Sequence, residues 1–360
     1  MELSSVFPIR EECLYLDHAT LAPLPQPTVA AMSELLALYQ REGFWQLRQV
    51  TFLDQKVRSL LSLLVGCQPF DVSLFPSFAV ALTALLAGLQ LPPGSHILLA
   101  LEQAEEARPL ARLLDRLGHR AQVVEEALWD RLPRALEELP PGPGVVVLPW
   151  VDALGWAATP ELWADRAWRR ERILVLDSRQ AVPCRPESFA ELDVDALLLV
   201  SHTWLLGPPG AAALITTHEL RQRWQPLLPS FRRSKGEMGD DAACFEGPPP
   251  APVVLAGLAA SLEILSQDLT TVRQRILNHQ RTLTAQLVEL GWSVDSPGAA
   301  HPVAGIVAAR HRFFPPQEVQ RRLQQRHVWV GVLGPWVRFS PHFYTTGAEL
   351  HALPKLLARL

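Results

Sequence analysis

The stretch from Ile173 to Ile215 constrains the fold more than any other part of the sequence. It contains two apolar runs of strand length, Ile173–Leu176 and Ala196–Val200, and polar residues follow each run. Such runs are typical of strands buried in a parallel sheet, and ligands of open α/β sheets bind at the carboxyl ends of the strands. The polar residues that arrive there are Asp177, Gln180, Ser201, His202 and Thr203. The sequence therefore predicts an α/β protein with a site at this edge.

The composition is that of a globular chain. Its 360 residues are 48% hydrophobic and 19% charged, which is enough for a large core and two domains. A net charge of −4, spread without long runs of one sign, argues against a nucleic-acid partner. We expect no membrane segment and no signal peptide, because no apolar run has the required length or flanks. The four cysteines form no C-x-x-C pair, which favours a reducing cytoplasm and predicts no metal site.

The periodicity of the apolar residues and the positions of Gly and Pro predict three segments. They are a large domain at 15–228, a loop at 229–252, and a small α/β domain formed by 253–360 together with 1–14. The large domain should hold a mostly parallel, seven-strand-type sheet. The further expected strands are Val72–Phe75, Ile97–Leu101, Val145–Leu148, Ala304–Ala308, Val328–Val332 and Trp336–Phe339. The expected helices are Thr28–Arg41, Asp54–Val65, Val80–Gln90, Glu105–Leu117, Pro160–Arg170, Glu219–Trp224, Pro316–Arg326 and a pair within Val253–Leu290 that breaks near Gln267–Leu269.

The central motifs resemble a known family. The D-x-x-Q of residues 177–180 and the H-T-W-L-L-G-P-P-G of residues 202–210 resemble the signature of the class V aminotransferase group of pyridoxal-phosphate (PLP) enzymes. That group includes cysteine desulfurases, kynureninase and isopenicillin N epimerase. The resemblance runs from about Tyr15 to the C-terminus and implies the fold type I architecture of PLP-dependent transferases. Within these central motifs one residue departs from the signature: Thr203 stands where the family has the lysine that forms the Schiff base.

The resemblance also implies a cofactor site. Asp177 would keep the pyridine nitrogen protonated, and Gln180 would bond the phenolic oxygen. The turn before the helix at 80–90 would bind phosphate, although Phe78 replaces a glycine there. Gln103 stands where the family has a histidine that stacks on the pyridine ring, and Asp152 stands where the family has an asparagine. The cofactor-binding residues expected in this way are Ser77, Phe78, Ala79, Gln103, Asp152, Asp177, Gln180, Ser201 and His202. Each also has an ordinary structural explanation; Asp177, for example, could cap a helix.

Two further segments bear on a small amino-acid-like ligand and on assembly. His18 lies in Y-L-D-H-A-T, where the family has asparagine, and Arg338 matches the arginine that grips a substrate carboxylate. The family's crossover loop ends in F-E-x-G-T and reaches a partner subunit. Here Phe245 and Glu246 are present but the Gly-Thr pair is not. The loop implies a homodimer, which light scattering would detect.

The position of Thr203 decides the chemistry that can be expected. A hydroxyl cannot form an imine, and unassisted threonine is a poor base at neutral pH. The chain has only three lysines, Lys56, Lys235 and Lys355, and Lys235 alone falls near the family's active site. A cysteine desulfurase also needs a mobile cysteine in the small domain, and none occurs at 301–360.

Three hypotheses follow. The first is a pseudoenzyme that keeps the fold, binds PLP without a covalent bond or not at all, and serves as a ligand- or partner-binding protein. The second is an unorthodox PLP enzyme (aminotransferase, lyase or epimerase on an amino acid) that uses His202 or Lys235 as base. The third is a binding protein for another phosphate- or carboxylate-bearing ligand. The departures at Phe78, Gln103 and Thr203 affect the phosphate site and the amine together, which favours the first.

Overall fold

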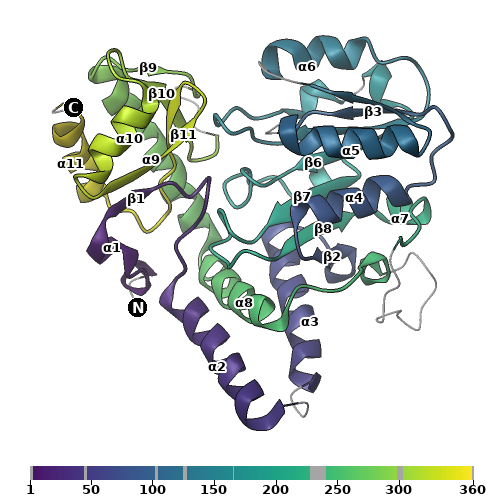
Figure 1. Ribbon diagram of the computed structural model, residues 1–360, viewed down its shortest axis with the longest axis horizontal. Helices are drawn as coiled ribbons and strands as arrows, with labels where there is room; N and C mark the ends of the chain where they lie inside the picture. Colours follow the sequence, from purple (N-terminus) through teal and green to yellow (C-terminus); the bar gives the residue numbers. More distant parts are fainter. Residues whose placement is uncertain are drawn as a thin grey trace.

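The computed structural model describes residues 3–43, 47–101, 104–124, 128–164, 166–227, 241–297 and 303–358. Two sheets account for the named strands of these residues, and they lie in different halves of the molecule (Figure 1). Gln103, Lys235 and half of the loop expected at 229–252 (residues 229–240) lie outside the described residues. The division into domains and the homodimer therefore stay predictions.

The larger sheet has seven strands in the order β2-β8-β7-β6-β5-β3-β4. The strands are β2 (Val72–Phe75), β3 (His96–Leu99), β4 (Arg120–Val123), β5 (Gly144–Pro149), β6 (Arg172–Asp177), β7 (Ala196–Val200) and β8 (Ala212–Thr216). Only β8 runs antiparallel to its neighbours, β2 and β7. The remaining pairs are parallel, so the expected mostly parallel seven-stranded sheet is confirmed.

Successive residues of the central strands face two different cores, which explains their unbroken apolar runs. In β5, Val146 and Leu148 join the core that contains α3 and α8, whereas Val145 and Val147 join the core that contains α4 and α5. The sheet is therefore covered by helices on both faces, as Figure 1 shows. The helices are α1 (Ile9–Glu12), α2 (Gln26–Glu42), α3 (Leu47–Val65), α4 (Phe78–Gly88), α5 (Ala104–Arg116), α6 (Leu128–Glu137), α7 (His218–Gln222), α8 (Pro252–Ser266), α9 (Leu269–Glu289), α10 (Pro316–Gln324) and α11 (Gly347–Leu357).

The smaller sheet has five strands in the order β1-β11-β12-β10-β9. The strands are β1 (Leu14–Leu16), β9 (Ser293–Val294), β10 (Val307–Arg310), β11 (Val328–Leu333) and β12 (Trp336–Phe339). Residues of α9, α10 and α11 pack against this sheet in a separate core. Strand β1 comes from the other end of the chain and pairs in parallel with β11, so the boundary expected at residue 15 falls inside a strand.

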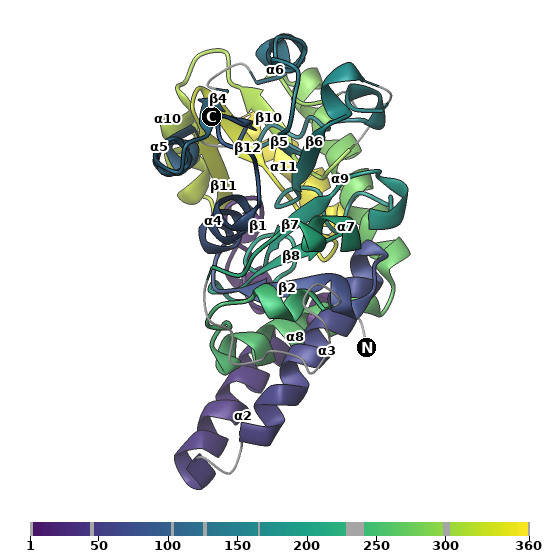
Figure 2. The ribbon, with the colours of Figure 1, turned by 90° about the vertical axis from the view of Figure 1, so that its right-hand side faces the viewer.

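Helices α2, α3 and α8 form the part of the molecule that extends downward in both Figure 1 and Figure 2. Helix α8 packs against both of the others. The break between α8 and α9 occurs where expected, and the Asp268 side chain caps α9 by accepting from the Thr271 N–H. Among the described residues no single helix is long and apolar enough to cross a membrane. Helices α8 and α9 meet the requirements of length and apolar composition only together, across an 83° bend.

The prediction of a helix over Pro160–Arg170 is wrong. The described residues there form two short 3₁₀ turns, Pro160–Leu162 and Ala167–Arg169. Trp163 and Trp168 are both buried, and their spacing of five residues would place them about 140° apart around one α-helix. Two separate turns allow both indoles to reach the core.

Candidate functional site

The turn between β2 and α4 has the form that the sequence predicts. Ser77 is the N-cap of α4, and its side chain accepts a hydrogen bond from the Val80 N–H at 3.3 Å. Ala79 is exposed and Phe78 is buried. The Phe78 ring lies under a guanidinium, because Cζ of Arg179 is 3.9 Å from the ring centroid. The predicted phosphate turn is therefore a helix N-terminus with a cation stacked beside it.

Asp177 ends β6 at the predicted edge of the sheet, and its carboxylate is bound by the same arginine. Arg179 donates from Nε to both carboxylate oxygens at 3.0 Å and from Nη2 to Oδ2 at 2.8 Å. The Arg179 N–H also donates to Oδ1 at 3.1 Å. The Asp177 side chain is only 3% exposed, so a buried carboxylate is held by several bonds from one residue.

Arg179 also contacts Glu106, on the first turn of α5. Its Nη2 lies 3.0 Å from Oε2 of Glu106 and its Nη1 lies 3.4 Å from Oε1. The guanidinium thus lies between two carboxylates, and we call this cluster of Asp177, Arg179 and Glu106 the arginine clamp. Sequence reasoning missed Arg179, which occupies a variable position of D-x-x-Q. The available signal was the combination of an arginine two residues after the aspartate with a phenylalanine at position 78.

The other predicted residues near the signature form hydrogen bonds with other parts of the protein. Gln180 donates from Nε2 to the Ala19 carbonyl at 3.1 Å and accepts from Nε1 of Trp204 at 2.7 Å. The Thr203 hydroxyl donates to the Arg179 carbonyl at 3.2 Å, and the Ser201 hydroxyl donates to the Pro208 carbonyl. These bonds fix the loop that follows β7 against the loop that follows β6.

Asp152 is likewise buried, and its carboxylate organises a turn. Its Oδ1 accepts from the Leu154 N–H at 2.9 Å and from the Trp156 N–H at 2.8 Å. Two backbone donors on one oxygen are typical of an aspartate that stabilises a tight loop. The structure therefore gives Asp152 a structural role in the loop after β5.

The two residues predicted to bind substrate lie where the N-terminal segment meets β12 and the segment that follows it. Arg338 donates from Nη2 to Oγ1 of Thr20 at 2.6 Å, and Nη2 lies 3.8 Å from Oδ1 of Asp17. His18 is fully buried; its Nδ1 donates to the Ser340 carbonyl at 2.9 Å, so Nε2 accepts from the Tyr344 hydroxyl at 2.7 Å. Neither Arg338 nor His18 lines the cavity described next.

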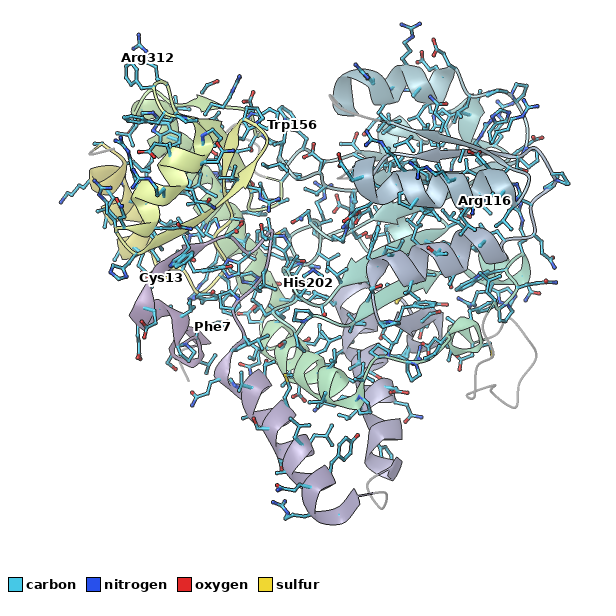
Figure 3. All side chains as sticks on the ribbon, viewed as in Figure 1. Phe7, Cys13, Arg116, Trp156, His202 and Arg312 are labelled. Atoms are coloured by element: carbon cyan, nitrogen blue, oxygen red, sulfur yellow. The ribbon has the colours of Figure 1, made fainter. Side chains whose placement is uncertain are left out.

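A cavity of about 570 Å³ opens beside the arginine clamp, between α4, α5 and the loop after β7. Four predicted residues line it: Ser77, Phe78, Ala79 and His202. Figure 3 shows His202 near the centre of the molecule, where the two halves meet. Burial and the positive charge of Arg179 lower the pKa of His202. The further lining residues are Pro76, Leu82, Thr83, Leu101, Glu106, Pro109, Leu110, Leu113, Arg179, Val200, Pro209, Gly210 and Ala211.

The buried state of His18 makes stability depend on pH. Burial lowers the pKa of His18 to about 4, from 6.5 for an ordinary histidine. The neutral ring stabilises the fold above pH 6.5, and this contribution is lost as the pH falls from 6.5 towards 4, because only the unfolded chain takes up the proton. We expect His18 to account for a loss of about 3 kcal/mol over this range.

Urea unfolding at pH 7.5, 6 and 5 measures this dependence. His18→Asn introduces the asparagine that the family has at this position and should remove part of the pH dependence of the free energy of unfolding. His351→Asn, at an exposed histidine of α11, is the control and should leave it unchanged. An unaltered pH dependence in His18→Asn would show that other groups carry it.

The comparisons with known proteins bear on the family and on the fold. The sequence profile of the family described as aminotransferase class-V matches residues 14–337. An uncharacterized aminotransferase, YcbU of Bacillus subtilis, is 27% identical over 206 residues, and the matched part spans 54% of each chain. The aligned region is thus about half the length of that relative.

Two solved structures have the same fold. The apo cysteine desulfurase of Thermococcus onnurineus superposes with a TM-score of 0.82 at 20% identity, covering 99% of this chain and 96% of that one. A lysine-to-alanine variant of C-DES, with glycine covalently linked to its PLP cofactor, gives a TM-score of 0.85 at 19% identity and covers 98% of both chains. The expected fold type I architecture is confirmed.

Proposed function

Because the chain belongs to the aminotransferase class-V family, we propose that it is a member without covalent PLP chemistry that serves as a ligand- or partner-binding protein. Thr203 stands at the position that the family motif assigns to the Schiff-base lysine. A threonine hydroxyl cannot form an imine with an aldehyde. Among the described residues, Lys56 is ion-paired with Glu263 and Lys355 lies on α11, so neither supplies the missing amine at this site.

The loss of a lysine does not carry the proposal alone. The lysine-to-alanine variant of C-DES holds PLP with glycine covalently linked to it, so this fold can keep the cofactor after a lysine is removed. A second and independent feature is needed to explain why this chain would not use PLP.

The arginine clamp is that feature, and it is the observation that carries the proposal. The family uses the aspartate at position 177 to bond the pyridine nitrogen. Here its carboxylate accepts from Arg179 at 2.8–3.1 Å. Binding PLP would require breaking a buried ion pair, which costs several kcal/mol. The donors and acceptors present do not fit the cofactor, and no reaction step is assigned to it.

One observation favours the second candidate, an unorthodox PLP-dependent enzyme acting on an amino acid. His202 lines the cavity, and its lowered pKa leaves its ring neutral and able to accept a proton at neutral pH. The other candidate base, Lys235, lies outside the described residues. This candidate requires that PLP displace Arg179 from Asp177, and for that reason we place it second.

The spectrum of the purified chain with added PLP tests the proposal against covalent attachment of PLP to a lysine of the chain, above all Lys235. We expect the free-aldehyde spectrum to persist and borohydride to leave every lysine unmodified, because among the described residues neither lysine belongs to the clamp or to the cavity beside it. Mass spectrometry of tryptic peptides checks each of the three lysines. A yellow absorbance band that borohydride traps on Lys235 would overturn the proposal, and its loss in Lys235→Arg would identify the residue.

A further inference from the structure

The cavity beside the arginine clamp has the character of a small-molecule site. Its volume of about 570 Å³ lies within the range of 300–1,000 Å³ that is typical of ligand pockets. Most of its wall is apolar and comes from α4, α5 and the end of β7. The few polar side chains are Ser77, Thr83, Glu106, Arg179 and His202, and they come from α4 and its N-cap, from α5 and from the loops after β6 and β7. An apolar wall with a small set of converging polar groups is the usual form of a site that orients one ligand.

The charges around the cavity select the class of ligand. Among the described residues that line it, Glu106 and Arg179 are the only charged side chains. Arg179 is already bound to Asp177 and to Glu106, and the three together carry a net charge of −1. No second cation is present in this lining to offset the excess. The N-terminus of α4 adds only a partial positive charge, so beside Glu106 an anionic group would enter against a net negative charge, whereas a cation would be attracted to it.

The positions of the two carboxylates indicate where a cation would bind. The Asp177 side chain is 3% exposed and lies behind the guanidinium. The Glu106 side chain is 39% exposed and lines the cavity, so its oxygens can be reached by a ligand. Apolar side chains of Leu82, Leu110 and Leu113 surround the remaining space. A ligand that suits both parts has a cationic end for Glu106 and an apolar body.

We propose that this cavity binds a primary amine with an apolar or aromatic body and without a carboxylate. The inference rests on the proposed function, because bound PLP would bring its phosphate to the same turn of α4. It differs from an amino-acid site, since an amino acid adds a carboxylate and the Arg338 that would grip it is bonded to Thr20, outside the cavity.

Three matched probes test the proposal by isothermal titration of the full chain. 2-Phenylethylamine has the ring and the amine; L-phenylalanine adds a carboxylate to it; phenylacetate keeps the ring and replaces the amine by a carboxylate. We expect 2-phenylethylamine to bind at least about threefold more tightly than either of the others, because the added carboxylate meets the partly exposed Glu106, at which one charge contact has a modest effect. Equal affinities, tighter binding of phenylacetate or no binding of 2-phenylethylamine would overturn the proposal.

Variants at the start of α4 locate the bound amine. Ala79 is exposed and lines the cavity, so Ala79→Trp fills the space at little cost to folding. Val80 is 36% exposed, follows Ala79 directly and does not line the cavity, so Val80→Trp is the matched control. We expect the first variant to abolish binding of 2-phenylethylamine and the second to retain it. Retention in both would place the amine elsewhere.

Variants on α5 test the charge. Glu106→Gln should weaken 2-phenylethylamine about threefold or more and strengthen phenylacetate, a modest effect because the carboxylate is partly exposed. Glu105→Gln removes a neighbouring carboxylate that does not line the cavity, and it should change neither affinity. Equal effects of the two substitutions would overturn the role of Glu106. If the amine proposal fails in these titrations, the proposed function still stands on the borohydride experiment. Cofactor trapped on a lysine would contradict the proposed function itself.

Discussion

Arg179→Ala is expected to lower the free energy of unfolding by about 3–5 kcal/mol, the range for removal of one partner of a buried ion pair. The substitution removes the guanidinium donors of the Asp177 carboxylate, which is 3% exposed, and leaves the backbone N–H of residue 179 as a donor. It also exposes one face of the Phe78 ring that the guanidinium covers. Urea unfolding followed by tryptophan fluorescence measures the change.

A double-mutant cycle shows whether the cost comes from the pair. Asp177→Asn with Arg179→Ala should cost less than the sum of the single substitutions, with a coupling of about 2 kcal/mol. Arg179→Lys keeps the charge but loses the planar fork, and its stability should fall between wild type and Arg179→Ala. Additive effects would mean that the two side chains stabilise the fold independently.

Thr203→Lys alone is expected to trap little PLP with borohydride, whereas Thr203→Lys combined with Arg179→Ala should trap at least about tenfold more. The lysine restores the amine, but only loss of Arg179 frees Asp177 to bond the pyridine nitrogen. The ion pair that PLP would otherwise have to break is worth more than the 1.4 kcal/mol that corresponds to tenfold. Absorbance of the reduced adduct and peptide mapping measure the trapped fraction.

Thr203→Lys with Arg185→Ala is the matched control for this prediction. Arg185 also follows β6, but it pairs with Glu187 rather than with Asp177. Its removal should leave trapping at the level of the single variant. If Thr203→Lys alone traps as much cofactor as the double variant, the clamp does not obstruct PLP.

The sequence predicted the central sheet well, because its strands are buried on both faces. Val72–Phe75 and Ala196–Val200 match β2 and β7 to the residue, since turns or polar residues bound these apolar runs. Strand β4 was not predicted. It lies at the edge of the sheet, and its residues Arg120–Val123 are exposed or half-buried, so no apolar run marks it.

The candidate site was predicted less completely. Motif positions placed Asp177 correctly at the end of β6, because the end of a buried strand is marked by the change from apolar to polar residues. The direction of the next side chains is set by tertiary contacts that no periodicity encodes. Arg179 therefore turns back onto Asp177, and Gln180 turns towards Trp204. The predicted contact of Gln180 with a cofactor stays a prediction.

One hydrogen bond of Trp204 joins the two halves of the molecule. The Trp204 carbonyl accepts from Nε2 of His342 at 3.1 Å, on the segment after β12, whereas the indole N–H bonds Gln180 within the half that holds the larger sheet. The Ala22 N–H also donates to the His202 carbonyl at 2.8 Å. A hinge motion that separated the halves would break these buried bonds, each of which is expensive to leave unmade. A ligand that enters between α4 and α5 avoids that barrier, so its association rate is set by diffusion and desolvation rather than by domain opening.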